Sequence, residues 1–445
     1  MNSPSQPTLT DSLAAYIVAM RDAPLDARTA DAVTDGFVDC AGTMMAGRNE
    51  PVVEVLTRLY GADTGPGGAS LLFGERRLDP QHAALINAAA GHALDYDDVA
   101  FASHPSVVMV PALLAEGEVL GSSGMAMLRA YHTGFEVWAE LIFRDADPHF
   151  SKGWHPTAVF GTVATAAAIA SLRGFDHAQC RTMLSLAASC AGGVIANFGT
   201  MAKPFHAGKA AAAALACARL VLAGMTAADD ALGAPSGLLR AISPQGKVET
   251  GPATPLLGQY FAREGICFKK YPLCYATHRV IDAATDLHRE QLDWSRITRV
   301  DIELGDVQYK LLKKQLPKDA LEAKFSIEFA FACGLRYGTA ELRHLDPGIV
   351  TEPAMIGLMG KVEVTEVRTT SDTVPGFSHA DRVRITLDDG RVVDSGERSV
   401  PRGHALTPAT REELKMKFFD CCDFGALEHA QAERIYARLI ALGSA

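Results

Sequence analysis

A helical periodicity running from residue 9 to about residue 260 constrains the fold most, and it is built largely from alanine, leucine and glycine. Apolar residues recur at helical spacing in QHAALINAAAGHAL (81–94), MAMLRAYHTGFEVWAELIF (125–143) and KPFHAGKAAAAALACARLVLAG (203–224). Helices with small side chains on their faces can approach one another closely. The pattern therefore predicts a large all-helical domain whose first part covers residues 1–264.

The pattern changes after about residue 265, where strand-like alternation appears. Residues 299–307 (RVDIELGDV) and 360–367 (GKVEVTEV) alternate as strands do, and 381–400 predicts a hairpin with Asp389-Gly390 at its turn. Helical stretches at 272–290 and 323–338 lie between them. We therefore predict a mainly α protein, with a smaller α+β domain at 265–402 and C-terminal helices at 403–445 that return to the helical domain.

Charge and cysteine usage exclude several classes of protein. The formal net charge of −10 argues against a general nucleic-acid or membrane-surface binder. The apolar run at 13–20 lacks the basic flank of a secretory signal, and the run at 157–172 is shorter than the roughly 20 residues of a membrane span. The nine cysteines include no C-x-x-C pair, which favours reduced thiols in a cytoplasmic protein.

A basic side chain stands beside a proline at four predicted helix starts. These are His104-Pro105, His155-Pro156, Lys203-Pro204 and Lys269-Lys270-Tyr271-Pro272. Proline suits the first helical position, and the free N–H groups of a helix start attract anions. Four such helix starts facing one cavity would bind a di- or tricarboxylate.

The segment GHALDYDDVAFASHPSV (91–107) gathers polar groups in an otherwise apolar region. His92, Asp95, Asp97, Asp98 and His104 are close enough in sequence either to form a polar loop or to act together. They match no H-E-x-x-H or EF-hand spacing, so we predict no metal. The glycine-rich segments at 64–70 and 206–211 match neither a dinucleotide fingerprint nor a phosphate-binding loop, so no nucleotide binding is expected.

Five segments, in order along the chain, resemble the MmgE/PrpD family. They are GHALDYDDVAFASHPSVVMVPALLAEGE, GWHPTAVFGTVATAAA, MAKPFHAGKAAAAALA, KKYPLCYATHRVIDA and AKFSIEF. The resemblance implies a large helical domain, a smaller α+β domain, an active site in the cleft between them, and a homodimer. It also implies an enzyme that needs neither a metal nor an organic cofactor.

Carried over by motif, the resemblance gives a set of candidate site residues. The catalytic candidates are Asp95, His104, His155, Lys203, Lys269, Cys274 and His278, and the candidates for binding the substrate are Lys203, Lys269, Lys270 and Arg279. Cys274 is expected one turn into a helix behind two lysines, an environment that lowers the pKa of a thiol.

The family's reactions begin or end at a carbon next to a carboxylate, where a base must work in a positively charged cavity. Its activities include 2-methylcitrate dehydration, cis-aconitate decarboxylation and iminodisuccinate epimerisation. This chain has Val99 and Cys274 where the decarboxylases have Thr and His, and it has Phe329 where many members of the family have Tyr. The departures favour an isomerase that epimerises iminodisuccinate, with a dehydratase-type lyase as the alternative. A decarboxylase and a non-catalytic carboxylate-binding protein are less favoured than these two functions.

Overall fold

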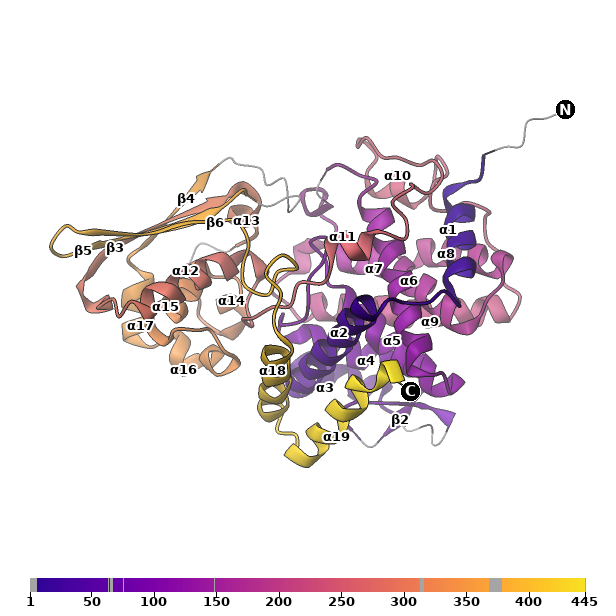
Figure 1. Ribbon diagram of the computed structural model, residues 1–445, viewed down its shortest axis with the longest axis horizontal. Coiled ribbons are helices and arrows are strands. Elements are labelled where there is room, and N and C mark those ends of the chain that lie inside the picture. The colour runs from indigo at the N-terminus through magenta and orange to yellow at the C-terminus, as the bar shows by residue number, and fades with distance from the viewer. Residues whose placement is uncertain are drawn as a thin grey trace. The chain divides into compact units, whose positions relative to one another are not determined.

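The computed structural model describes residues 6–62, 64, 67–74, 76–147, 149–312, 316–367 and 378–444 (Figure 1). It divides the chain into two compact units. The helical unit comprises Met1–Ala93, Ser103–Ile266 and Arg411–Ala445, and the mixed unit comprises Leu94–Ala102 and Cys267–Thr410. The short segment 94–102 belongs to the mixed unit because Val99 and Cys267 exchange backbone hydrogen bonds of 2.8 and 2.9 Å.

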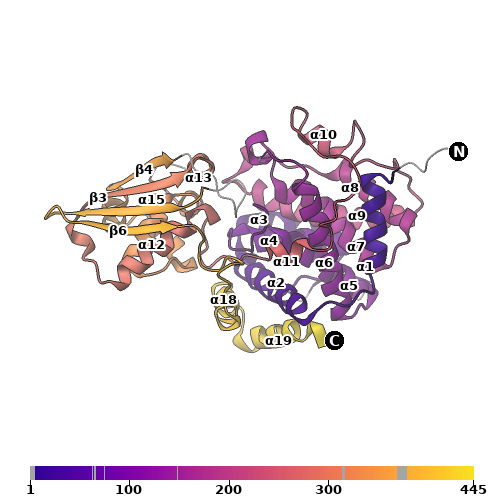
Figure 2. The same ribbon diagram turned by 45° about the horizontal axis from the view of Figure 1, so that its top comes forward.

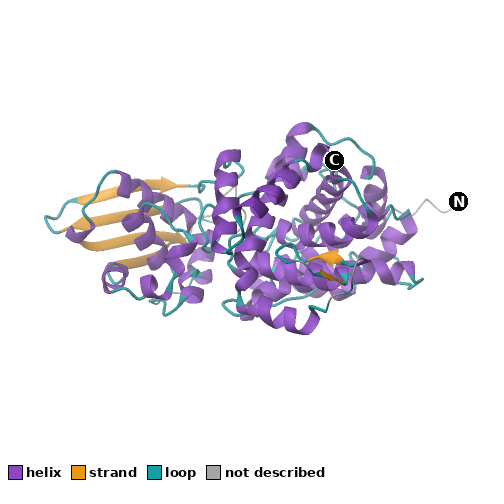
Figure 3. Ribbon diagram, turned by 90° about the horizontal axis from the view of Figure 1, so that it is seen from below, coloured by secondary structure: helices purple, strands orange, loops and turns teal. Residues whose placement is uncertain are grey.

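Helices account for most of the helical unit, as Figure 3 shows. Their bounds are α1 Leu9–Met20, α2 Ala27–Ala46, α3 Pro51–Tyr60, α4 Pro80–Ala93, α5 Pro105–Leu120, α6 Gly124–Ile142, α7 Pro156–Arg173, α8 His177–Cys190, α9 Ala202–Leu222, α10 Leu238–Ile242, α11 Tyr260–Glu264, α18 Arg411–Phe424 and α19 His429–Ile440. Two short antiparallel strands, β1 Ala69–Ser70 and β2 Arg77–Leu78, complete it. α18 and α19 pack against α2.

The core of the helical unit forms around α7, which packs against α5, α6, α8 and α9. Small residues are required where helices come closest. A Cβ atom on Gly208 of α9 would lie 2.4 Å from the backbone oxygen of Leu85 on α4, and one on Gly161 of α7 would lie 2.8 Å from the Trp138 ring on α6. The alanine- and glycine-rich faces seen in the sequence therefore set the spacing of these helices.

Among the described residues, α9 is long and apolar enough to cross a membrane by length and composition. Its buried residues pack against α4 and α7, so the helical core accounts for its apolar character.

The mixed unit is a sheet covered by helices (Figure 2). The strands are β3 Ile297–Gly305, β4 Val362–Val367, β5 Asp381–Leu387 and β6 Val392–Arg398, in the order β4-β3-β5-β6. β3 pairs with β4 in parallel, and the other neighbours are antiparallel. The helices are α12 His278–Arg289, α13 Asp306–Leu311, α14 Ala320–Ala323, α15 Ile327–Tyr337, α16 Pro347–Val350 and α17 Pro353–Met359.

The predicted fold class, mainly α with a smaller α+β part, is confirmed. β5 alternates buried and half-buried residues, and its inner face packs against α12, which in turn packs against α15. The predicted hairpin is also present. Gly390 adopts a φ of 82° at its turn, a conformation that glycine adopts without strain.

The predicted helix over 272–290 was wrong at its start, because α12 begins only at His278. Cys274 has an extended backbone, and its N–H donates to the Lys324 carbonyl at 2.8 Å. A single 3₁₀ turn, Tyr275–Thr277, then leads into α12. Pro272 therefore does not open a helix, and the anion-binding argument fails at this position.

Candidate active site

Two histidine rings meet inside the helical unit. The Nδ1 atoms of His155 and His206 lie 3.2 Å apart, and these side chains are 1% and 6% exposed. His155 precedes α7, with Pro156 at the first helical position as predicted, and its backbone N–H donates to the Gly193 carbonyl at 2.9 Å. His206 comes from the first two turns of α9. Both rings are thus positioned by the starts of buried helices.

The hydrogen bond between these rings fixes their tautomers relative to each other. One Nδ1 must carry the shared proton and the other must accept it. In a neutral pair, the ring that donates through Nδ1 has a bare Nε2, and the ring that accepts carries its proton on Nε2. The pair therefore combines one proton acceptor with one proton donor, whichever of the two arrangements is populated.

Two further histidines and a phenylalanine surround His155. The His92 ring, at the end of α4, stacks on it with centroids 5.8 Å apart, and His104 meets His92 edge-on at 4.6 Å. His104 precedes α5, with Pro105 at the first helical position as predicted. The Phe198 ring meets His155 edge-on at 4.8 Å. These rings leave His155 little contact with water.

Burial lowers the pKa of His155 well below its usual range, and the neighbouring positive charges of His92, Lys203, His104 and His206 add to this effect. The pKa of His206 is also lowered, first by burial and then by Lys209 and Lys203. Both rings are therefore neutral at neutral pH, as the tautomer argument requires.

Lys203 brings a positive charge to the same helical unit. It is the second residue of α9, one helical turn before His206, and is 7% exposed. Its Nζ atom lies 5.2 Å from the centroid of the Phe198 ring. The structure corrects the expected position of the proline here: α9 begins at Ala202, so Pro204 occupies the third helical position. The first four N–H groups of a helix have no intrahelical partner, so proline is tolerated there.

Lys269 and Asp95 form a buried ion pair in the mixed unit. Lys269 Nζ lies 3.0 Å from Asp95 Oδ1 and donates to the Asp95 carbonyl at 2.6 Å. The side chains are 1% and 6% exposed, and Asp95 adopts a φ of 54°. Lys269, a predicted substrate-binding residue, therefore serves first to hold Asp95. Asp97 and Asp98 are fully buried in this unit.

The other predicted residues also belong to the mixed unit. Cys274 is 7% exposed, and His278 is fully buried with Nε2 at 3.3 Å from the Leu273 carbonyl. Arg279 is held by the Ser378 carbonyl at 3.0 Å and by Asp381 at 3.5 Å. Lys270 is exposed, and its carbonyl accepts the Tyr96 hydroxyl at 3.2 Å. Arg279 is thus already paired with a carboxylate of its own unit.

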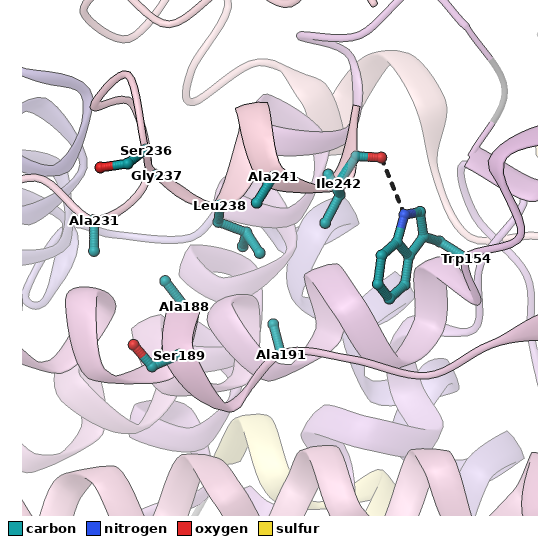
Figure 4. Close-up of a pocket in the computed structure, with 10 residues that line it drawn as sticks. All are labelled: Trp154, Ala188, Ser189, Ala191, Ala231, Ser236, Gly237, Leu238, Ala241 and Ile242. Carbon is teal, nitrogen blue, oxygen red and sulfur yellow. Dashed lines mark hydrogen bonds between the residues drawn. The ribbon is translucent and has the colours of Figure 1, made fainter. Parts of the chain in front are cut away.

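A cavity of about 330 Å³ lies beside the segment that carries His155 (Figure 4). Trp154 lines it and donates through Nε1 to the Ile242 carbonyl at 3.0 Å. Most of the remaining wall consists of small residues from the end of α8 and from the chain around α10, namely Ala188, Ser189, Ala191, Ala231, Ser236, Gly237 and Ala241.

His206 and Gly193 were not among the predicted site residues. The available signal for His206 was its position three residues after Lys203, which places both on one face of a helix. Gly193 gave no signal, because its role depends on contacts made after folding. A Cβ atom there would lie 2.8 Å from the Ala158 Cβ and 3.3 Å from the His206 ring.

Both parts of the chain match models of one protein family. Residues 11–251 match the MmgE/PrpD N-terminal domain, and residues 271–442 match the MmgE/PrpD C-terminal domain. The chain is 30% identical to cis-aconitate decarboxylase of Mus musculus over 417 residues, 87% of this chain and 82% of that protein. It is 27% identical to the Homo sapiens cis-aconitate decarboxylase over 426 residues, 92% of this chain and 87% of that protein. A cis-aconitate decarboxylase-like protein of Aspergillus oryzae, oryM, is 24% identical over 443 residues, 94% of this chain and 91% of that protein. Since the two domain models together cover most of the sequence, this chain belongs to the MmgE/PrpD family, as its five motif segments had indicated.

Proposed function

We propose that the protein is a lyase that acts on a small di- or tricarboxylate by proton transfer at a carbon near a carboxylate, with cis-aconitate as the first candidate substrate. The observation that carries the proposal is the His155–His206 pair, which holds one proton donor and one proton acceptor in a buried, neutral state. Similarity to cis-aconitate decarboxylases supports the choice of substrate.

Decarboxylation of such a substrate breaks the bond between a carbon and its carboxylate, and CO₂ leaves. The electron pair stays on the carbon, which then takes a proton from the Nε2–H of one histidine of the pair. The shared proton moves across the 3.2 Å Nδ1–Nδ1 hydrogen bond, water supplies a proton to the other Nε2, and the hydroxide that remains combines with CO₂ to give bicarbonate. The pair thereby exchanges roles and is ready to act again.

Lys203 is the candidate partner for a carboxylate that the reaction does not remove. It is buried beside Phe198 and carries a positive charge close enough to His155 to depress the pKa of that ring. In a site with few waters, such a charge stabilises the negative charge that develops on the substrate.

The burial of Val99 and Phe329 weakens the evidence that these residues gave for an isomerase. Phe329 is fully buried in α15 and Val99 is 7% exposed, with its backbone paired to Cys267. Buried apolar side chains of this kind are explained by the packing of the mixed unit. Val99 and Phe329 therefore give little support for choosing epimerisation over a lyase reaction.

Epimerisation of iminodisuccinate is the second candidate function, and the same histidine pair favours it. An epimerase removes a proton from one face of a carbon and returns one to the other face. A bare Nε2 and a protonated Nε2, joined by a shared proton, provide both groups, and each turnover would swap their roles.

The test is to incubate the protein in D₂O with cis-aconitate, 2-methylcitrate or iminodisuccinate and to follow each by NMR. Loss of CO₂ from cis-aconitate with deuterium in the product supports the proposal. Alkene formation from 2-methylcitrate would make the enzyme a dehydratase, and deuterium exchange in iminodisuccinate alone would make it an epimerase. Binding without turnover of any of the three would indicate a non-catalytic carboxylate-binding protein and overturn the proposal.

Variants then connect turnover to the site. His155→Ala should remove most of the activity, since losing a proton-transfer group costs a factor of roughly 100 to 10,000 in rate. Lys203→Ala should do the same, since it removes the positive charge that stabilises the developing negative charge. Lys247→Met changes an exposed lysine of the helical unit and serves as the control. Turnover at the wild-type rate by both site variants would place the reaction elsewhere.

A further inference from the structure

Cys190 and Cys217 bring two thiols together where the end of α8 meets α9, the helix that also carries His206. Their sulfur atoms lie 3.9 Å apart, although the residues are separated by 27 positions. Cys190 ends α8 and is half-buried, whereas Cys217 is buried in α9. A disulfide has an S–S distance of about 2.05 Å, so the two sulfurs need to approach by about 2 Å to form one.

The two thiols differ in character. The hydrogen bond from Cys217 and the positive charge of Lys209 lower the pKa of Cys190 to about 6 against the effect of burial. The pKa of Cys217 is raised, first by its hydrogen bond to Cys190 and then by burial. Cys190 is therefore the thiolate at neutral pH, and the thiolate is the form that reacts with oxidants.

Cys190 is followed directly by the segment that positions both histidines. The Gly193 carbonyl accepts the backbone N–H of His155 at 2.9 Å, and a Cβ atom added to Gly193 would lie 3.3 Å from the His206 ring. Lys209 donates to the Gly192 carbonyl at 3.5 Å. On the other side, Cys217 belongs to the same helix as Lys203 and His206. A bond between the two sulfurs would therefore pull on the supports of both rings.

We propose that Cys190 and Cys217 are a modification site at which hydrogen peroxide forms a reversible disulfide that displaces His155 relative to His206. A loss of turnover caused by this displacement would rest on the proposed function. The disulfide and the displacement of the rings do not rest on it.

The chemistry proceeds in two balanced steps. The Cys190 thiolate attacks one peroxide oxygen, the O–O bond breaks, and the departing hydroxide takes a proton to become water. Cys190 is then a sulfenic acid, oxidised by two electrons. The sulfur of Cys217 attacks the sulfur of Cys190, the S–O bond breaks, and the Cys217 proton leaves with the hydroxide as a second water.

Access supports Cys190 as the first thiol to react. It is half-buried, and its neighbours Ser189 and Ala191 line the cavity beside Trp154 (Figure 4). Cys180, on the same helix, is fully buried, and burial raises the pKa of its thiol to about 12. Cys180 therefore provides a matched control within α8.

The first experiment treats the full chain with equimolar hydrogen peroxide, blocks the remaining thiols and maps peptides by mass spectrometry without reduction. We expect a peptide pair joined at Cys190 and Cys217, the loss of two of the nine free thiols, and their return with dithiothreitol. Cys190→Ser should abolish the cross-link, and Cys180→Ser should leave it unchanged. Oxidation of other cysteines first, or oxidation of Cys190 beyond sulfenic acid with Cys217 still reduced, would overturn the proposal.

The second experiment follows the histidine rings by NMR in protein labelled at histidine, which requires no substrate. Peroxide should shift the His155 and His206 signals in the wild type and in Cys180→Ser, but not in Cys190→Ser. A disulfide that forms without moving either signal would refute the proposed displacement. Should the three candidate substrates all prove inert, both experiments would still decide this proposal.

Discussion

The ammonium group of Lys269 contacts Asp95 twice, through its carboxylate at 3.0 Å and its backbone carbonyl at 2.6 Å. A buried ion pair whose members are both removed from water adds little net stability, but loss of one partner leaves an unpaired buried charge at a cost of about 3–5 kcal/mol. The pair therefore makes Lys269 a structural element of the mixed unit as well as a candidate site residue.

Stability measurements can separate these two roles. Lys269→Met should lower the free energy of unfolding by about 3–5 kcal/mol, since it removes the buried cation that balances the charge of the Asp95 carboxylate. The double variant Asp95→Asn/Lys269→Met should recover much of that loss, and the exposed Lys318→Met should change stability by less than about 0.5 kcal/mol. Denaturant unfolding of the four proteins provides the comparison. A Lys269→Met protein as stable as the wild type would show that the ion pair contributes little.

Chelation provides a test of the predicted absence of a metal. Asp95 already lies against a positive charge supplied by the protein itself, and the histidine pair can transfer protons without a metal. Dialysis against a strong chelator should therefore leave turnover unchanged. Loss of activity that Mg²⁺, Fe²⁺ or Zn²⁺ restores would instead contradict the predicted absence of a metal.

Variants of His206 distinguish proton transfer from positioning. An asparagine can donate or accept a hydrogen bond near the former Nδ1 atom, but it has no group at the position of Nε2. We expect His206→Asn to lose a factor of roughly 100 or more in kcat. The exposed His429→Gln is the control. If His206→Asn restored most of the activity lost in His206→Ala, the role of His206 would be to hold the His155 ring.

The pH dependence of the site follows from the lowered pKa of His155. The pair must be neutral to combine one proton donor with one proton acceptor, and burial keeps the His155 ring neutral below pH 6.5. The Cε1–H signal of His155 should therefore show no protonation between pH 8 and pH 6.5, and kcat/KM should show no loss from this group over that range. A titration midpoint at or above 6.5 would contradict the buried arrangement of His92, His104 and His206 around it.

Local sequence signals were sufficient for the elements that form by local rules. The hairpin around Gly390 and the helix starts at Pro105 and Pro156 depend on turn and capping preferences that neighbouring residues encode. The start of α12 was missed because the Cys274 backbone bonds to Lys324, fifty residues further along. A contact of that kind overrides the apolar helical pattern of the segment.

The same distinction applies to the candidate site. Motif resemblance gave His155, Lys203, Lys269 and Asp95 as candidates without showing which of them touch. The pairing of His155 with His206 joins α7 to α9, and the pairing of Lys269 with Asp95 joins segments 174 positions apart. Such partners depend on tertiary packing, so sequence spacing could not supply them.

A buried histidine of the mixed unit should make that unit sensitive to acid. The Nδ1 atom of His344 accepts the backbone N–H of Glu341 at 2.9 Å, its ring stacks on Tyr337 at 4.3 Å, and it is 4% exposed. Burial, with a smaller effect of Arg343, lowers the pKa of His344 to about 4. Protonation of Nδ1 would remove the acceptor that caps this turn.

The sign of the effect follows from the two pKa values. Because the folded-state pKa lies below the unfolded value of about 6.5, the unfolded chain binds more protons between these limits. The stability contributed by neutral His344 is therefore complete above pH 6.5 and is lost as the pH falls towards 4, at no more than about 1.4 kcal/mol per pH unit for one proton. His344→Gln should unfold more easily than the wild type at pH 7.5, and the difference should shrink by pH 4.5, whereas His429→Gln should follow the wild type throughout. Denaturant unfolding at a series of pH values measures this, and a difference that stays constant from pH 7.5 to 4.5 would show that His344 does not titrate in this range.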